Sequence, residues 1–228
     1  VTAVGAHGRS QDRVTSVFQV DWTPPQTGIA YDVFVAPRGD AGECSSCPEQ
    51  DADVTSNTTV LAAAWCCGWH DEQTPIAGFS VMFGTAPEVD DVVEWRWVGL
   101  DESITLYNQD LEQGATYFAC VAARNAAGLY SDAVCTDGVT VDTTPPTVSW
   151  VKDGISDPDI DNQAFLNMAF ANWEGNDDES GVVEYELAWG TTPGDDDLYA
   201  WESSMTATLN GLLPGANEFD VEPAKGST

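Results

Sequence analysis

The residues with the clearest chemistry are six cysteines, at positions 44, 47, 66, 67, 120 and 135. An even number in a secreted-looking acidic chain favours disulfides and an oxidising compartment. We predict a disulfide between Cys120 and Cys135, with free or differently paired thiols as the alternative. The other four, Cys44, Cys47, Cys66 and Cys67, would then pair among themselves. The competing interpretation is a zinc site with four thiolate ligands. The Cys44-x-x-Cys47 spacing is compatible with such a site, whereas the adjacent Cys66 and Cys67 are not.

Carboxylates at alternating positions suggest a second chemistry. Asp157, Asp159 and Asp161 follow Asp153 on a predicted loop, and oxygen ligands in this pattern suit calcium. The spacing lacks the glycine and the distal glutamate of an EF-hand, and a solvated acidic loop is the alternative. Calcium is the one cofactor that the sequence suggests.

An acceptor sequence for an N-linked glycan begins at Asn57, in Asn57-Thr58-Thr59. It precedes a predicted strand, so we expect an exposed loop.

Tryptophans supply the candidate contact residues. Trp95 and Trp97 flank Arg96 and share one face of a predicted strand. They could form a carbohydrate platform or a contact between subunits, although packing on their own core is the favoured reading. Trp22 and Trp69 lie in a linker and a loop, and are the better candidates for contacts between modules.

The sequence gives little support for a catalytic site, and we expect that the protein is not an enzyme. The only histidines are His7 and His70. His70 lies near Cys66 and Cys67, which we expect to be oxidised and therefore unable to act as nucleophiles. Carboxylates are too abundant to indicate glycosidase chemistry, and no phosphate-binding glycine loop occurs.

Charge excludes several classes of partner. Acids outnumber bases 38 to 7, for a formal net charge of −31. Such a surface repels nucleic acid and anionic lipid, and it attracts divalent cations. No apolar run is long enough to span a bilayer, so we expect no membrane insertion. Nine tryptophans and eight phenylalanines are enough to build true cores.

Internal repeats divide the chain. Val20-Asp21-Trp22-Thr23-Pro24-Pro25 recurs as Val141-Asp142-Thr143-Thr144-Pro145-Pro146, and Gly84-Thr85-Ala86-Pro87 recurs as Gly190-Thr191-Thr192-Pro193. Residues 21–141 therefore form one complete module. Residues 142–228 form a second, shortened module without its last strand. Residues 1–8 resemble residues 121–128, so residues 1–20 are expected to be the closing strands of a preceding module or a donor segment.

Period-two apolar patterns predict the fold. Strands are expected near 29–35, 58–65, 76–83, 93–98, 103–107, 116–124 and 133–140, separated by turn residues. Seven strands of this kind indicate an all-β chain of tandem immunoglobulin-like sandwiches.

Leu111 precedes Tyr117 by six positions, and Trp65 and Trp173 lie in equivalent strands of the two copies. In these features the complete module resembles a fibronectin type III domain, which has such a corner before its sixth strand and a core tryptophan on its second. The second copy departs from the pattern, because Phe219 replaces the corner tyrosine and Pro223 interrupts what is expected to be its sixth strand. The resemblance implies an extracellular or cell-surface repeat protein.

Three functions compete at this level. The first is a structural subunit of an extracellular fibre or surface appendage, assembled head to tail with itself. In its sharper version, residues 10–20 of one subunit complete the sandwich at 145–228 of the next. The second is an adhesion module that binds glycans. The third is a non-catalytic accessory region of a secreted enzyme.

Overall fold

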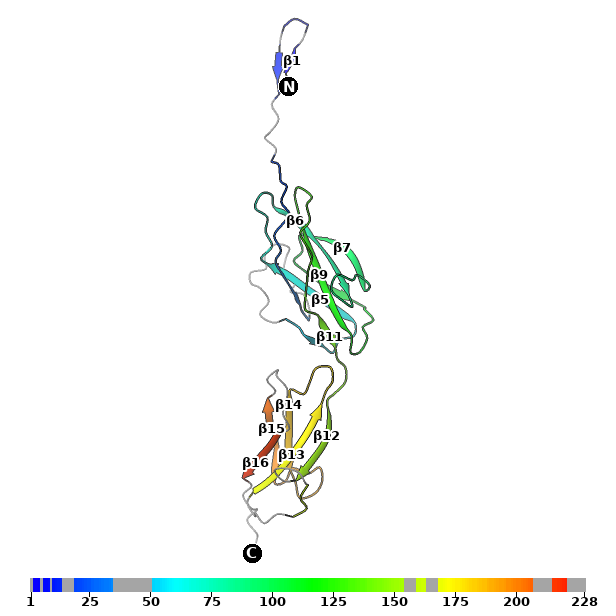
Figure 1. Cartoon of the computed structure of the whole chain (residues 1–228), viewed down its shortest axis with the longest axis vertical. Helices are drawn as coiled ribbons and strands as arrows, with labels where there is room; N and C mark the ends of the chain where they lie inside the picture. Colours follow the sequence, from blue (N-terminus) through cyan, green and yellow to red (C-terminus); the bar gives the residue numbers. More distant parts are fainter. Residues whose placement is uncertain are drawn as a thin grey trace. The chain divides into compact units, whose positions relative to one another are not determined.

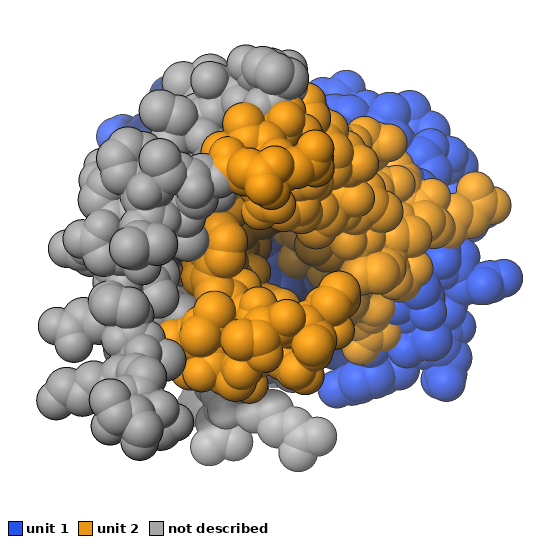
Figure 2. All heavy atoms as spheres, turned by 90° about the horizontal axis from the view of Figure 1, so that it is seen from below, with its two compact units in different colours: residues 1–53, 58–111, 115–139 blue, residues 54–57, 112–114, 140–228 orange. Residues whose placement is uncertain are grey.

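The computed structural model describes residues 2–4, 6–8, 10–13, 19–34, 51–153, 159–162, 168–206 and 215–220. Cys44, Cys47 and Asp157 lie outside these residues. The described part contains strands and no helix, so the prediction of an all-β chain is confirmed (Figure 1). The chain divides into two compact units. Unit 1 comprises residues 1–53, 58–111 and 115–139, and unit 2 comprises residues 54–57, 112–114 and 140–228 (Figure 2).

Two sheets form the first sandwich. One has the order β3 (Ile29–Asp32), β5 (Val60–Cys67), β8 (Ser103–Tyr107). The other has the order β4 (Val54–Thr55), β11 (Val139–Val141), β9 (Thr116–Asn125), β6 (Ile76–Gly84), β7 (Val93–Gly99), and β10 (Val134–Cys135) also pairs with β9. This division of strands between two sheets is that of immunoglobulin-like and fibronectin type III sandwiches.

The core lies between these sheets. Trp65 of β5 is fully buried, and its ring centroid lies 6.0 Å from that of Phe79 on β6. Tyr117 and Val121 of β9 are buried on the same side, as the alternating pattern predicts. Leu111, before β9, is also buried. Burial of large side chains of this kind contributes ~2 kcal/mol each.

The predicted strand at 133–140 is in fact two short strands, β10 and β11. Gly138 separates them with a φ of 100°, a conformation that a side chain resists. Its amide donates to the Asp32 carboxylate at 3.0 Å. After this break, β11 again lies beside β9 and also takes up a parallel pairing with β4.

The second sandwich has a three-stranded sheet and a two-stranded sheet. β12 (Thr147–Asp153), β13 (Met168–Asn176) and β16 (Gly215–Asp220) form the first, while β14 (Glu184–Trp189) and β15 (Tyr199–Thr206) form the second. Trp173 is buried, and its ring centroid lies 5.9 Å from that of Tyr185.

Phe219, expected at the corner before the sixth strand, lies instead within the strand β16. β16 pairs with β13, which is the position that β8 holds beside β5 in unit 1. The backbone groups on both edges of the central strand β13 need hydrogen-bond partners. Residues 215–220 supply them along one edge, although the residues before them resemble the corner of another strand. In the described part of unit 2, β14 pairs with β15 alone.

The turns from β6 to β7 and from β14 to β15 are the same. Thr85 donates its amide to Asp91 Oδ1 at 2.8 Å and its hydroxyl to Asp91 Oδ2 at 2.6 Å. Thr191 makes the equivalent bonds to Asp197 at 2.7 Å and 2.8 Å. A Cβ on Gly84 would lie 1.4 Å from the Val89 oxygen, so only glycine fits the turn. The repeat seen in the sequence is thus a repeat in structure.

A short hairpin lies near the N-terminus. β1 (Thr2–Val4) pairs with β2 (Ser10–Asp12), with Val4 opposite Ser10. The turn that follows β9 has the same register, since Arg124 is bridged to Tyr130. Gly8 and Gly128 both have positive φ, at 73° and 92°. The resemblance of residues 1–8 to residues 121–128 therefore extends to backbone conformation.

Candidate functional sites

Two connectors, residues 20–25 and 141–146, are held by the same aspartate-centred network, which we call the connector clamp. In the first, Asp21 Oδ1 accepts the Thr23 amide at 3.0 Å, and Asp21 Oδ2 accepts the Thr74 hydroxyl at 2.5 Å. The Asn125 amide group, almost fully buried, donates to Asp21 Oδ2 at 2.8 Å and to Asp71 Oδ2 at 3.0 Å. These bonds tie the connector to the loop before β6 and to the end of β9.

The second connector repeats the arrangement. Asp142 Oδ1 accepts the Thr144 amide at 2.9 Å and the Thr144 hydroxyl at 3.0 Å. Hydrogen bonds from the Ser180 side chain, the Thr144 amide and Gln113 hold the pKa of Asp142 at about 2. Gln113 Oε1 in turn accepts the amide and the hydroxyl of Thr143, both at 2.6 Å.

The loops that close the two clamps are also alike. Asp71 accepts the Thr74 amide at 2.8 Å, and Asp177 accepts the Ser180 amide at 2.9 Å. The hydrogen bond from Thr74 and that from the Asn125 side chain lower the pKa of Asp71. Each clamp therefore contains a carboxylate that stays ionised well into acid solution. The sequence showed the repeated Asp-x-Thr-Pro-Pro motif, but the parts played by Asn125 and Gln113 were missed.

An exposed aromatic face lies on β7 and β9. Trp95 and Trp97 are 40 % and 47 % exposed, so the expectation that they pack on their own core is wrong. Both project from the outer side of the edge strand β7, where Trp97 lies opposite Ser80 of β6. The Arg124 guanidinium lies 5.9 Å from the centroid of Trp97 and 5.5 Å from that of Tyr130. The cation thus lies close to two accessible rings.

The other two candidate tryptophans differ from each other. Trp22 is 71 % exposed, as expected for a contact residue in a connector. Trp69 is largely buried, and its ring packs edge-on against Phe79 with centroids 5.6 Å apart. A Cβ on Gly28 would lie 2.3 Å from Trp69 Cδ1. Trp69 therefore closes one end of the core, and the expectation of an exposed contact is wrong there.

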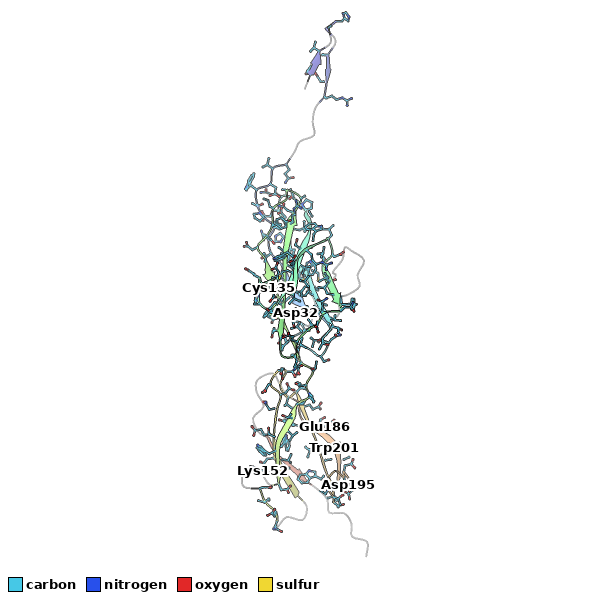
Figure 3. The ribbon with its side chains drawn as sticks, turned by 90° about the vertical axis from the view of Figure 1, so that its right-hand side faces the viewer. Asp32, Cys135, Lys152, Glu186, Asp195 and Trp201 are labelled. Atoms are coloured by element: carbon cyan, nitrogen blue, oxygen red, sulfur yellow. A yellow bond between two sulfur atoms is a disulfide. The ribbon has the colours of Figure 1, made fainter. Side chains whose placement is uncertain are left out.

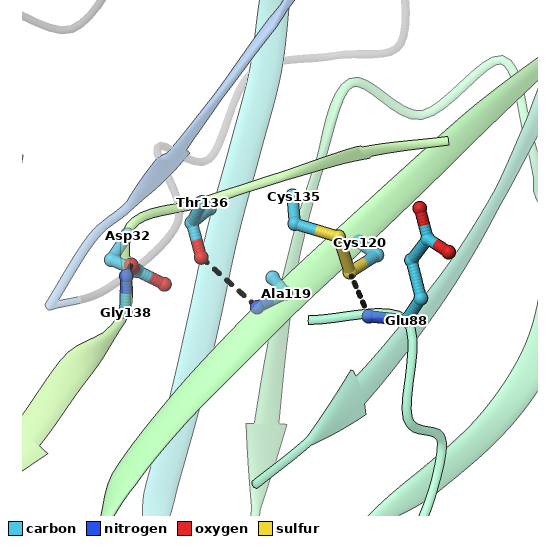
Figure 4. Close-up of a disulfide and its surroundings, with 7 residues drawn as sticks. All are labelled: Asp32, Glu88, Ala119, Cys120, Cys135, Thr136 and Gly138. Carbon is cyan, nitrogen blue, oxygen red and sulfur yellow. Dashed lines mark hydrogen bonds between the residues drawn. A yellow bond between two sulfur atoms is a disulfide. The ribbon is translucent and has the colours of Figure 1, made fainter. Parts of the chain in front are cut away.

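The disulfide between Cys120 and Cys135 is present (Figure 4). Cys120 faces away from the core, as the alternation predicts, yet it is fully buried. Cys135 and the turn at Glu88 cover it, and the Glu88 amide lies 3.3 Å from Cys120 Sγ. Beside the disulfide, the Thr136 hydroxyl accepts the Ala119 amide at 3.0 Å. This pair fixes the short strand β10 to β9.

Cys66 and Cys67 are both disulfide-bonded, which removes the thiolates that a zinc site would need. His70 is exposed, with Nδ1 3.0 Å from the Gly68 oxygen. Because Cys66 and Cys67 are oxidised, neither offers a thiolate that His70 could activate as a nucleophile.

A buried carboxyl lies beneath the first sandwich's edge. Asp32 is 2 % exposed, and burial raises its pKa from 3.8 to about 7, with the Asp51 charge adding to the effect. The Thr136 side chain and the Gly138 amide oppose the rise by hydrogen bonding to the carboxylate. Asp32, Asp51 and Asp137 bring carboxylate oxygens within 4.8 Å of one another, as do Asp142, Asp177 and Glu179. These described groups have the oxygen chemistry that calcium prefers.

The predicted calcium loop is described only in part. Asp159 and Asp161 are exposed, and Asp159 Oδ1 accepts the Asp153 amide at 2.7 Å. Calcium at Asp157, Asp159 and Asp161 stays a prediction. Asn57 is exposed in the turn before β5, where an attached glycan has room, and its glycosylation also stays a prediction.

Unit 2 contains a cavity of about 440 Å³ between its two sheets. Trp173 of β13 and Tyr185, Leu187 and Trp189 of β14 line it. Glu186 and Asp195 also line it and are labelled in Figure 3. Figure 2 shows unit 2 hollowed on the face it presents.

Comparison with known proteins gives only distant structural similarities. No family model and no curated protein matches the sequence. The chain is similar to the FN1–FN3 domains of chicken CNTN1 at 13% identity and a TM-score of 0.34, covering 77% of this chain and 54% of that one. It is similar to the α-L-rhamnosidase from Dictyoglumus thermophilum at 12% identity and a TM-score of 0.31, covering 54% of this chain and 15% of that one. Scores this low carry no argument, so the assignment to the β-sandwich class rests on the strand order itself.

Among the described residues, no helix is long and apolar enough to cross a membrane.

Proposed function

We propose that this chain is a structural segment of an extracellular fibre or surface appendage, built from consecutive β-sandwich modules and without catalytic activity. The observation that carries the proposal is the connector clamp, because Asp21 and Asp142 each accept the amide and the hydroxyl of the threonine two residues later, Thr23 and Thr144. A clamp holds its connector in one conformation. Such connectors suit a fibre, in which successive modules must keep a constant orientation. Two consecutive prolines after each clamp stiffen the same segments.

Covalent and electrostatic features support an extracellular setting. Each cysteine in the described part of the chain is in a disulfide, which is the state expected in an oxidising compartment. A net charge of −31 keeps such a chain soluble where salt screens the repulsion between copies. We propose that its main partner is another copy of itself.

The clamp can be tested by limited proteolysis of the intact protein. Replacing Asp142→Ala removes the acceptor for Thr144 and Gln113, so cleavage within residues 141–146 should become roughly tenfold faster. Asp110→Ala, at an exposed position, is the matched control and should leave the rate unchanged. Equal rates for all three proteins would contradict the proposal. Negative-stain microscopy should show end-to-end particles, whereas isolated particles at every concentration would count against a fibre.

The exposed aromatic face supports a second candidate, adhesion to glycans. Sugars stack on accessible rings, and Trp95, Trp97 and Tyr130 offer three on one face beside Arg124. A glycan array should then detect binding that Trp97→Ala abolishes and Trp22→Ala leaves intact. An array without any signal, or a signal that survives Trp97→Ala, would remove this candidate.

A further inference from the structure

The exposed aromatic face holds an arginine without an acidic partner. The chain has 38 acids and only seven lysines and arginines, so a cation on its surface has many carboxylates with which it could pair. Arg124 is exposed on β9, and among the described residues no carboxylate forms an ion pair with it. Its neighbours are instead the rings of Trp97 and Tyr130. An unpaired guanidinium on an accessible face of so acidic a chain offers a place for an anion from another molecule.

Three neighbouring strands bring these groups together. β7, β6 and β9 are consecutive in their sheet (Figure 1). Trp97 of β7 lies opposite Ser80 of β6. Arg124 of β9 lies opposite Gly78, two residues earlier on β6. A Cβ on Gly78 would lie 2.6 Å from Trp97 Cζ2, so the indole occupies the space above this glycine. Because Gly78 has no side chain, the Trp97 ring can reach across β6 towards Arg124.

The two rings hold the guanidinium in place. Arg124 Cζ lies over the Trp97 ring at 5.9 Å from its centroid, and over the Tyr130 ring at 5.5 Å. Contact with two rings restricts a long side chain before any ligand arrives, so less conformational entropy is lost on binding. A guanidinium presents its N–H donors in a planar fork that matches the two oxygens of a carboxylate. The site is therefore pre-organised for a carboxylate that lies beside an aromatic surface.

The rings themselves supply the second half of the recognition. Trp97 and Tyr130 are 47 % and 51 % exposed, so part of each ring is open to a ligand. The apolar face of a sugar can stack on such a ring. Because the cation lies within 5.9 Å of both ring centroids, a sugar stacked on one of them can present a carboxylate to Arg124 at the same time.

Charge selects the kind of acidic ligand. In the described part of this face, Arg124 is the one guanidinium beside the rings, and the whole chain carries a net charge of −31. A densely sulfated polymer needs several cations and is repelled by the rest of such a surface. An acidic peptide also brings several charges, and it offers no sugar face to the rings. A single carboxylate interacts mainly with Arg124, since the Debye length is about 8 Å at physiological salt.

We propose that Arg124, Trp97 and Tyr130 bind a sugar that carries a carboxylate, such as a hexuronic acid within a polysaccharide. The carboxylate accepts two N–H bonds from Arg124, the sugar ring stacks on the Trp97 indole, and Tyr130 helps to hold the guanidinium. This inference rests on the second candidate function, adhesion to glycans, and it names the class of glycan.

The test is isothermal titration calorimetry of the whole protein at about 0.15 M salt. The probes are a tetramer of galacturonic acid, the same tetramer with its carboxyls methyl-esterified, and a tetramer of galactose. The three have the same number of rings, but only the first is charged. We expect the acid to bind roughly tenfold more tightly than the ester or the neutral tetramer, because only the acid forms charge-assisted bonds with Arg124.

Variants assign the preference to the arginine. Arg124→Gln removes the cation but keeps an N–H donor, so it should bind the acid and the ester equally. Arg124→Lys keeps the charge without the planar fork and should retain part of the preference. Arg96→Gln is the matched control, since Arg96 lies opposite the fully buried Val81 and so on the other side of β7 from Trp97. It should leave the preference unchanged. The comparison of acid with ester on the unaltered protein needs no variant to fold.

Equal affinity for the acid and the ester would overturn the proposal while leaving adhesion to glycans in place. A preference that survives Arg124→Gln would place the carboxylate elsewhere and overturn it as well. So would tighter binding of a sulfated galactose tetramer, or equally tight binding of a tetra-aspartate peptide, which would make an acidic protein segment the partner. A protein that binds neither these probes nor any sugar on the glycan array would remove adhesion itself, and this proposal with it.

Discussion

Asp32 should make the first sandwich less stable as the pH rises. Its carboxyl is 2 % exposed, and burial raises its pKa from 3.8 to about 7. The folded protein therefore keeps a proton that the unfolded chain releases above about pH 4. The stabilisation is complete below the unfolded pKa and is lost as the pH rises through the folded pKa. At about 1.36 kcal/mol for each pH unit between the two values, the loss is at most ~4 kcal/mol.

The perturbation that exposes this effect is Asp32→Asn. An amide keeps an oxygen that can accept the Gly138 amide, now 3.0 Å from Asp32 Oδ2, and it carries no charge to bury. The variant should therefore lose the pH dependence and unfold at higher urea than the wild type above about pH 7. We expect a gain of ~2 kcal/mol there, since relaxation and water reduce the ceiling.

The assay is urea unfolding followed by tryptophan fluorescence, from about pH 4 to about pH 8. The difference in unfolding free energy between Asp32→Asn and wild type should grow from about pH 4 and level off above about pH 7. Asp53→Asn, at an exposed position, is the control and should run parallel to the wild type. If the Asp32→Asn curve is also parallel to the wild type, the carboxyl is ionised in the folded state and the reasoning is refuted.

Three further predictions concern the disulfide, a turn and the second clamp. Replacing both Cys120 and Cys135 with serine releases a loop with a sequence separation of 15, which should cost unit 1 ~3 kcal/mol in urea unfolding; an unchanged midpoint would contradict this. Gly84→Ala places a Cβ 1.4 Å from the Val89 oxygen, so the turn must open and calorimetry should show a loss of ~2 kcal/mol or more. Carbon NMR should show the Asp142 carboxyl titrating at about pH 2. The stability that this carboxylate contributes is therefore present above pH 3.8 and lost as the pH falls through 2. A titration midpoint near 3.8 would show that the clamp is open.

Features set by local sequence could be predicted. The Gly84 and Gly190 turns and the Asp-x-Thr-Pro-Pro connectors need only neighbouring residues, so their repetition in the sequence was enough to find them. The pairing of Cys120 with Cys135 followed from two adjacent strands joined by one turn.

Features that depend on distant residues could not be predicted in this way. Gly138 meets Asp32 across 106 residues, and Asn125 meets Asp21 across 104. No period or motif joins such positions, and a buried aspartate looks in the sequence like any other acid. The same limit explains Trp97, whose exposure depends on β7 being the edge strand of its sheet.

The two glutamates of β14 also bear on the symmetry of any assembly. An open strand edge can pair with a copy of itself about a twofold axis, which would end growth at a dimer. Such pairing would bring Glu184 and Glu186 of one molecule against the same acids of the other, where like charges across a ladder are unfavourable. These like charges therefore disfavour a closed dimer made by pairing two β14 strands with each other.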